Sequence, residues 1–305
     1  MSDTIQNHGM GWLPDYPDLR DYTVEMDEVS PKLKSFGQKD SIKSMLKSVG
    51  VDDPNKLSLP NEVDVIPWCS PIEDQGKLGS CTANAGVGLV EYFETKAFGK
   101  HIDASRLFLY KVTRNLMHLT GDTGAFLRTT MGSMVLFGVP PEEYLLYVVE
   151  DFDVEPSAFC YSFARNYQVI SYYRLDPQGI TREELLKRIK ANLAGKLPSM
   201  FGFVVYESIR QAQLSGKIPF PTPNERRLGG HAIISVGYDD DIKIKNIIPS
   251  GEETTGALMI RNSWGEDWGN KGYGWLPYKY VLTGLVIDWW SLLRNEWIDT
   301  ENFRF

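Results

Sequence analysis

Three side-chain types that thiol-based acyl transfer requires occur in separate stretches of the chain: a cysteine, a histidine and an asparagine. Cys81 follows Gly76 and Gly79 and opens a helical pattern. Its sulfur would then lie at a helix N-terminus, where the macrodipole and free N–H groups favour the thiolate, and Gly79 would let a substrate backbone approach closely. His231 precedes the apolar run Ala-Ile-Ile-Ser-Val, so a strand would hold its ring rigidly. A cysteine and a histidine placed together can carry nucleophilic catalysis, with the histidine as the base.

Two carboxamides complete this candidate set. Asn262 ends another apolar strand pattern, and its oxygen can accept a hydrogen bond from the imidazole and fix the tautomer, as the carboxylate does in a serine triad. Gln75 lies six residues before Cys81. Its amide, together with the backbone N–H of Cys81, could donate to the oxyanion that develops on a substrate carbonyl. Trp264 lies two residues after Asn262 and could shield the histidine–asparagine hydrogen bond from water.

Each of these residues alone has a more ordinary explanation. A cysteine near a helix start is usually a small buried hydrophobe, and His231 and Asn262 could be a hydrogen-bonded strand-end histidine and a turn residue. The other histidines, His8, His101 and His118, fall in the polar N-terminal stretch or near helix ends, where we expect them to be solvated. No Cys–Cys or His–His pair has the spacing of zinc ligands, so neither a metal nor another cofactor is expected.

The composition favours a folded chain and argues against two kinds of partner. Of the 305 residues, 42% are apolar and 12% aromatic, enough to bury a substantial core. The net charge is -8, from 32 basic and 40 acidic side chains, whereas nucleic-acid binding needs clustered Lys and Arg. No apolar run approaches the length of a membrane span. Neither nucleic acid nor a membrane is therefore expected as a partner, and no pattern sets an oligomeric state.

The three cysteines, Cys69, Cys81 and Cys160, are odd in number and too few for a disulfide framework. Isolated thiols are favoured, although one Cys69–Cys160 bridge stays open. The first ten residues are polar and lack the basic and apolar regions of a secretory signal. We therefore expect a reducing compartment and a cytoplasmic location, with secretion from a trimmed precursor as the alternative.

Residues 1–58 are predicted to form a leader, with a boundary near Leu59. They contain a Pro/Asp-rich stretch at 13–18 and then a short amphipathic helix, with Asp40 or Ser41 as its cap and Gly50 as its end. The apolar face of this helix is formed by Ile42, Met45, Leu46 and Val49. Such a face must dock on another part of the protein.

After the leader, a helical half precedes a strand-rich half. Helices are predicted over 81–98, 104–117, 126–137 and 181–193, the first two capped by Ser80 and Asp103. Strands are predicted at 200–206, 232–238, 257–262 and 272–276. This order indicates an α+β fold with two lobes, a helical lobe at about 59–195 and a β-rich lobe at about 196–305.

Taken together, these stretches resemble the active-site motifs of papain-like cysteine peptidases. The run Gln75-Gly76-Lys77-Leu78-Gly79-Ser80-Cys81 is similar to the cysteine segment of that family, Gly230-His231-Ala232 to its histidine strand, and Asn262-Ser263-Trp264-Gly265 to its asparagine block. The order Cys, His, Asn is the order of the family, and the similarity extends from about Asp64 to Trp290. Three separate motifs in this order make a chance match improbable.

The resemblance implies a papain-like two-lobed fold, with a helical left lobe bearing Cys81, a β-barrel-like right lobe bearing His231 and Asn262, and the active site in the cleft between them. It implies that peptide or protein substrates are hydrolysed through a thioester acyl-enzyme on Cys81. His231 would be general base and acid, Asn262 would orient it, and Gln75 would lie in the oxyanion hole. The substrate-binding positions implied are Gly79, Gly124, Gly230 and Trp264.

The sequence departs from the family pattern in three places: Thr82 stands where many members have Trp, Leu78 replaces a cysteine, and the loop 121–124 lacks a cysteine and one glycine. The leader is short and looks like that of some bacterial relatives. We expect it to cover the cleft and inhibit the enzyme, with a disordered tail as the alternative. A binding module without turnover is disfavoured by the intact set of four residues, whereas a transpeptidase would use the same acyl-enzyme and stays open.

Overall fold

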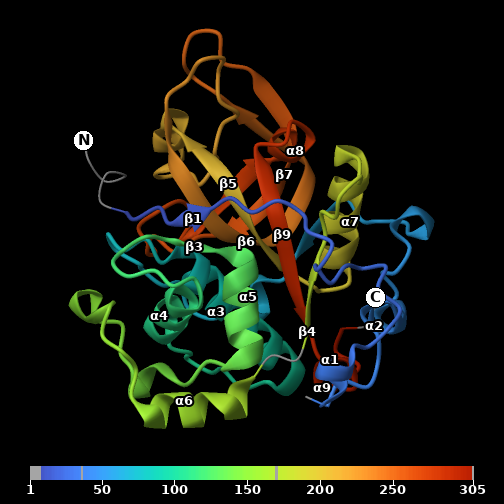
Figure 1. Ribbon diagram of the computed structural model, residues 1–305. Coiled ribbons are helices and arrows are strands. Elements are labelled where there is room, and N and C mark those ends of the chain that lie inside the picture. Colours follow the sequence, from blue (N-terminus) through green and yellow to red (C-terminus); the bar gives the residue numbers. More distant parts are fainter. Residues whose placement is uncertain (1–7, 36, 169–170, 304–305) are drawn as a thin grey trace.

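The structure is a computed structural model that describes residues 8–35, 37–168 and 171–303. A helical lobe and a β-rich lobe lie against each other, and the N-terminal segment runs between them (Figure 1). The helices of the first lobe are α3 (Cys81–Phe98), α4 (Arg106–Leu116), α5 (Leu127–Leu136) and α6 (Ala158–Ala164). The predicted α+β class with two lobes is confirmed.

Helix α3 lies at the junction of the two lobes. It packs against the sheet on one side and against α4 and α5 on the other, and most of its residues are buried. Gly99, in the left-handed region at φ 67°, ends it as predicted. Ser80 stands at the N-cap position but its hydroxyl bonds Tyr147 and Asn84, so the predicted side-chain cap is wrong. The first N–H groups of α3 therefore stay available to the sulfur at its start.

One further expectation in the helical lobe needs correction. Helix α4 is capped by Ser105, whose Oγ accepts from the N–H of Phe108 at 3.1 Å, and not by Asp103. Helix α6 was not predicted. The helices expected over 126–137 and 181–193 are confirmed as α5 and as α7 (Arg182–Ala194), the latter with a capping box between Thr181 and Glu184.

The β-rich lobe is built on one sheet with strand order β4-β9-β5-β6-β7-β8, in which all pairs are antiparallel, while β2 pairs with β6 off this path. The strands are β2 (Glu62–Asp64), β4 (Ser171–Arg174), β5 (Ser199–Tyr206), β6 (Arg227–Lys245), β7 (Glu253–Arg261), β8 (Tyr273–Pro277) and β9 (Val286–Leu293). Helices α7 and α8 (Tyr278–Leu282) pack on this sheet. The four predicted strands are confirmed as β5 to β8, whereas β2, β4 and β9 were not predicted.

The described parts of the leader, residues 8–35 and 37–58, pack on the body rather than forming a disordered tail. Its first strand, β1 (Trp12–Leu13), pairs with β3 (Ala125–Phe126) at the junction of the lobes, and α1 (Pro31–Ser35) follows. Helix α2 (Ile42–Val49) is capped by Ser41 and ended by Gly50, as predicted, and packs against α9 (Asn295–Ile298). The side chains of its apolar face are at most 2% exposed, and they are Ile42, Met45, Leu46 and Val49. The leader helix is therefore part of the hydrophobic core.

Candidate active site

Cys81 is the first residue of α3, and its sulfur is fully buried. The backbone N–H of Gly11, from the leader, donates to its Sγ at 3.4 Å. Burial raises the pKa of the Cys81 thiol to about 11, although backbone N–H groups of Ala232, Gly11 and Thr82 act in the opposite direction. Ala232 directly follows His231 in the chain. The contact of its N–H with the sulfur therefore places the segment that contains His231 next to Cys81. With the leader in place the thiol is neutral at neutral pH.

His231 and Asn262 are hydrogen-bonded to each other across β6 and β7. The distance from His231 Nε2 to Asn262 Oδ1 is 2.8 Å, and the same oxygen accepts from the N–H of Ser263 at 2.8 Å. Because this oxygen is an acceptor, Nε2 carries the proton and Nδ1 keeps a free lone pair. Nδ1 is buried and has no hydrogen-bond partner among the described residues. Burial lowers the pKa of His231 to about 4, so the ring is neutral.

Trp264 covers the histidine–asparagine pair. Its ring stacks on that of His231 with the centroids 4.6 Å apart. His8 of the leader also stacks on Trp264, with the ring centroids 5.3 Å apart. Its Nδ1 lies 3.8 Å from the carboxylate of Asp74. The expectation that His8 is solvated is therefore wrong, because the leader is packed in the cleft and burial lowers the pKa of His8. His101 and His118 are exposed, as expected.

Gln75 is fully buried, and its amide is held in one orientation. Its Oε1 accepts from Ser263 Oγ at 2.6 Å. Its Nε2 donates to the carbonyl of Leu78 at 2.8 Å and to the carbonyl of Gly9 at 3.0 Å. A leader carbonyl therefore occupies the place to which the sequence prediction assigns a substrate carbonyl.

The glycines expected to bind substrate contact the leader. The carbonyl of Gly11 accepts from the N–H of Ala125 at 2.8 Å. A Cβ at Gly124 would overlap that same Gly11 carbonyl, and one at Gly79 would come 3.4 Å from the Cα of Gly11. Gly230 lies under the ring and carbonyl of Trp12. The structure thus brings all eight predicted site residues to one cleft, which leader residues 8–13 occupy.

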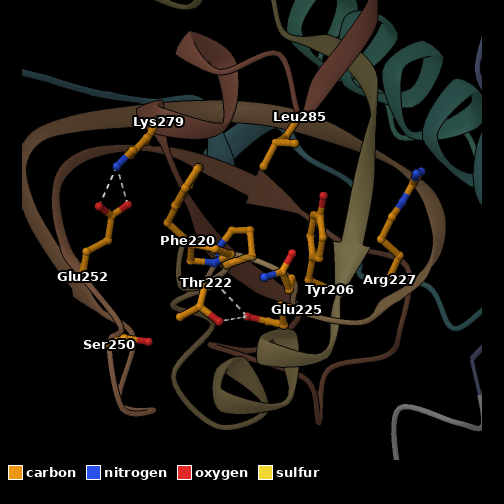
Figure 2. Close-up of a pocket in the computed structure, with 12 residues that line it drawn as sticks. Tyr206, Phe220, Thr222, Glu225, Arg227, Ser250, Glu252, Lys279 and Leu285 are labelled. Atoms are coloured by element: carbon orange, nitrogen blue, oxygen red, sulfur yellow. Dashed lines mark hydrogen bonds and ion pairs between the residues drawn. The ribbon is translucent and has the colours of Figure 1, made fainter.

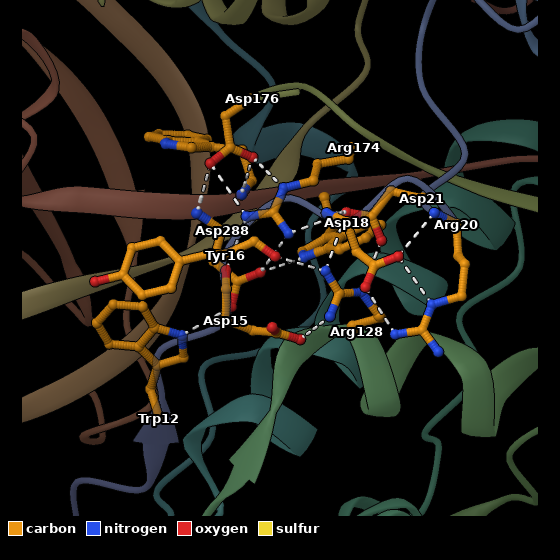
Figure 3. A network of polar contacts seen from close by, with 12 residues as sticks. Trp12, Asp15, Tyr16, Asp18, Arg20, Asp21, Arg128, Arg174, Asp176 and Asp288 are labelled. Atoms are coloured by element: carbon orange, nitrogen blue, oxygen red, sulfur yellow. Dashed lines mark hydrogen bonds and ion pairs between the residues drawn. The ribbon is translucent and has the colours of Figure 1, made fainter. Parts of the chain in front are cut away.

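Beyond the cleft, ion pairs join the leader to the body (Figure 3). Arg128 Nε donates to Asp21 at 2.6 Å and Arg128 also pairs with Asp15. Arg174 on β4 lies 3.3 Å from Asp21. It is fully buried, and a buried charge without a partner is costly. Together with Arg128 on α5, it holds the stretch that follows Trp12 against the body.

Two contributors to the cleft were not predicted. The carboxylate of Asp122 accepts from the N–H of Gly79 at 3.0 Å and from the hydroxyl of Tyr110 at 2.5 Å, and so fixes the turn before Cys81. The sequence signal for Asp122 was its place between two glycines in the loop 121–124. Asp288 accepts from the indole N–H of Trp12 at 3.0 Å. A charged residue inside the apolar run of β9 was a signal for it.

Another hollow, with a volume of about 610 Å³, lies in the β-rich lobe (Figure 2). Its wall includes Tyr206, Phe220, Glu225, Arg227 and the ion pair of Lys279 with Glu252. None of the predicted site residues lines it. This hollow therefore contributes no group to the arrangement around Cys81.

Some expectations concern groups other than the cleft residues. In the part of the chain that the structure describes, no cluster of three or more His, Cys, Asp or Glu side chains could hold a metal ion, and no helix has the length and apolarity to cross a membrane. All three cysteines are free. The isolated thiols that the sequence favoured over a Cys69–Cys160 bridge are thus what the structure contains.

Known proteins are similar to this chain over most of its length. Residues 59–281 match the family model described as papain family cysteine protease. The uncharacterized peptidase C1-like protein L477 of Acanthamoeba polyphaga mimivirus is 31% identical over 299 residues, which cover 96% of this chain and 89% of the viral protein. Cathepsin K of Gallus gallus is 27% identical over 209 residues, covering 68% of this chain and 54% of the cathepsin.

Solved structures of cysteine proteases have a similar fold. Xylellain, a cysteine protease from Xylella fastidiosa, aligns with a TM-score of 0.71 and 31% identity, covering 94% of this chain and 97% of xylellain. Procathepsin L 3 of the Tenebrio molitor larval midgut aligns with a TM-score of 0.59 and 19% identity, over 79% of this chain and 72% of that one. At that identity the second likeness concerns the fold alone.

Proposed function

The chain belongs to the papain family of cysteine proteases, and on that premise we propose that it hydrolyses peptide bonds through a thioester formed on Cys81. The observation that carries this proposal is the 2.8 Å hydrogen bond between His231 and Asn262, which leaves Nδ1 of the histidine unpartnered. The next residue, Ala232, has its N–H at the sulfur of Cys81, which begins helix α3. An imidazole with a free lone pair can accept the proton of a thiol that it reaches.

The reaction takes two steps. His231 Nδ1 accepts the thiol proton of Cys81, and the sulfur attacks the substrate carbonyl carbon, whose electron pair moves to oxygen. The Gln75 Nε2–H and the backbone N–H of Cys81 donate to that oxyanion. The C–N bond then breaks as His231 gives its proton to the leaving amine, which leaves the thioester. Water loses a proton to His231 and attacks the thioester carbon. The C–S bond then breaks, the acid leaves, and His231 returns the proton to the sulfur of Cys81.

The leader inhibits this reaction in the full chain. Its Gly9 carbonyl is held by Gln75, but it is the N–H of Gly11 that faces the sulfur. The leader backbone thus occupies both the sulfur and Gln75 and blocks the approach of a substrate carbonyl. Its tether gives it a high effective concentration. Residues 8–13 carry this effect, since the leader from α2 onward packs away from the cleft.

The test compares variants of the full chain that all carry Gly11→Ala. A Cβ at Gly11 would overlap the carbonyl of Gly79, so this change expels the leader strand. In that background, Cys81→Ala should abolish hydrolysis of a fluorogenic peptide, and His231→Ala should be nearly as severe. Asn262→Ala should be milder, because the amide only orients the base.

The matched control is Cys160→Ala, which removes another buried thiol whose sulfur bonds the carbonyl of Tyr144. It should keep full turnover and full labelling by an active-site-directed epoxide, which peptide mapping should locate on Cys81. Turnover that survives Cys81→Ala at the level of the control would refute the assignment of the nucleophile.

A further inference from the structure

The peptide unit between Leu78 and Gly79 is held at both of its ends. Its carbonyl accepts from Gln75 Nε2 at 2.8 Å. Its N–H donates to the two carboxylate oxygens of Asp122 at 3.0 and 3.1 Å. A peptide unit is planar, and in the trans form its C=O and N–H point in opposite directions. The group that fixes the N–H of Gly79 therefore also fixes the direction of the carbonyl that Gln75 binds.

The amide of Gln75 needs this carbonyl in order to keep one orientation. The last torsion of a glutamine side chain is broad and has no sharp preference. One anchor is the hydroxyl of Ser263, which donates to Oε1 at 2.6 Å. The carbonyl of Leu78 takes one hydrogen of Nε2, and the other hydrogen then points into the cleft, where Nε2 lies 3.0 Å from the carbonyl oxygen of Gly9. Without the Leu78 anchor, the hydrogen that serves the oxyanion would lose its fixed direction.

The Leu78–Gly79 peptide would be free to turn if Asp122 did not hold it. A residue without a Cβ adopts positive φ about as readily as negative φ, so the peptide before Gly79 can flip at little steric cost. A Cβ at Gly79 would come 2.8 Å from Asp122 Oδ1. The missing side chain thus admits the carboxylate, and the carboxylate supplies the restraint that the glycine lacks.

Asp122 is itself held by the interior of the helical lobe. The hydroxyl of Tyr110, on α4, donates to Asp122 Oδ1 at 2.5 Å and accepts from the N–H of Gly124 at 3.0 Å. Tyr110 is fully buried, and the guanidinium carbon of Arg114 lies 4.2 Å from its ring centroid. The acceptor for the N–H of Gly79 is therefore fixed by a rigid side chain, although Asp122 is exposed.

The two segments that Asp122 joins are those in which the sequence departs from the family pattern. Leu78 replaces a cysteine that many members have, and the loop 121–124 lacks another. All three cysteines of this chain are free, so no covalent link stiffens the segment before Cys81. The hydrogen bonds of Asp122 join the two segments instead.

We propose that Asp122 is a positioning residue of the oxyanion hole, which acts through the Leu78–Gly79 peptide on the amide of Gln75. The proposal rests on the proposed function, because it concerns how well Gln75 stabilises the oxyanion that forms when Cys81 attacks. A donor to the oxyanion acts in the transition state and not in substrate binding. Removal of Asp122 should therefore lower kcat and kcat/KM by the same factor and leave KM unchanged.

The test is a double-mutant cycle in the full chain that carries Gly11→Ala, with a peptide coumarinamide as substrate. Asp122→Ala should lower kcat by about 10- to 100-fold, the order of loss that follows when a catalytic group is misplaced by about 1 Å. In the presence of Gln75→Ala, the same change should have almost no effect, because no amide is left to position. Losses that multiply, or no loss from Asp122→Ala alone, would overturn the proposal.

Two further variants separate the hydrogen bond from the charge and from general damage. Asp122→Asn keeps a carbonyl oxygen that can accept from Gly79 and Tyr110, so it should retain most of the turnover that Asp122→Ala loses. Asp151→Ala removes another exposed acidic side chain of the helical lobe and should match the parent. An Asn variant as poor as the Ala variant would show that the charge and not the acceptor matters, which contradicts the proposal. If Asp122→Ala does not fold, Asp122→Glu, whose carboxylate is displaced by one methylene, takes its place in the cycle.

Alkylation of Cys81 distinguishes the positioning of Gln75 from a displacement of the nucleophile. Asp122→Ala should be alkylated at the rate of its Gly11→Ala parent, and a slower rate would mean that Asp122 acts through the thiol, which would overturn the proposal. If the parent is active and the Asp122 variants match it, this proposal fails and the proposed function stands. If the parent is neither alkylated nor active, the proposed function fails, and this proposal fails with it.

Discussion

Reactivity of the Cys81 thiol reports directly on the leader. The sulfur is fully buried under Gly11, and this burial raises the thiol pKa from 9.0 to about 11. A rise of that size lowers the thiolate fraction at neutral pH about 100-fold, equivalent to about 2.7 kcal/mol. Only the thiolate reacts with iodoacetamide at a useful rate. In the full chain at pH 7, Cys81 should therefore be alkylated at least about 100-fold more slowly than an ordinary free thiol.

Gly11→Ala should remove this protection. Its Cβ would overlap the carbonyl of Gly79, which is backbone and cannot turn aside. Once the strand is displaced, water reaches the sulfur, and the start of α3 and the imidazole of His231 favour the thiolate. The labelling rate at pH 7 should rise by about 100-fold or more, and the apparent pKa in the pH profile should fall below 9.0.

The assay is timed alkylation of the full chain between pH 6 and 10, with the Cys81 peptide quantified by mass spectrometry. Gly132→Ala is the matched control, because a Cβ there meets nothing within 4 Å, and it should label like the wild type. If Gly11→Ala and the wild type label Cys81 at the same rate with the same pH profile, the leader does not control the thiol.

Three other changes test separate parts of the structure. Gln75→Ala should lower turnover in the Gly11→Ala background by about 10²–10³-fold and spare alkylation of the thiol; unchanged turnover would remove Gln75 from the site. Leu46→Ala, in a helix face at most 2% exposed, should lower the free energy of unfolding by about 2–5 kcal/mol in urea titrations, whereas a change near zero would mean that α2 is not docked. Burial raises the pKa of Glu91 from 4.5 to about 7, so stability that is present below pH 4.5 should be lost as the pH rises to 7. Glu91→Gln should flatten this slope, and parallel slopes in thermal unfolding would contradict it.

The leader, which the sequence predicts to end near Leu59, packs on the body in two different places. Residues 8–13 lie in the cleft, but the helix face of α2 is buried in the core. A chain that starts near Leu59 would lose both the strand in the cleft and this part of the core. Displacing the strand at Gly11 separates the two effects, which truncation does not.

Local chemistry determined what the sequence predicted correctly. The apolar period of α2, the glycine ends of α2 and α3, and the apolar runs of β5 to β8 are properties of neighbouring residues, which is why they could be predicted without the tertiary structure. The three motifs indicated Cys81, His231 and Asn262 through their resemblance to the papain family, and their catalytic roles stay a prediction. Strand β9 was missed because it is buried on both faces, so its sequence does not alternate between polar and apolar residues.

Only the tertiary structure decided how distant groups meet. Ser80 and Asp103 are good caps by type, but Ser80 is bonded to Tyr147, and Ser105 takes the place of Asp103. His8 lies in a polar stretch, yet it stacks on Trp264 because the leader crosses the cleft. The pairing of Trp12 with Asp288 joins residues 276 positions apart. Contacts of this kind depend on which surfaces the folded chain brings together, and no local pattern in the sequence encodes them.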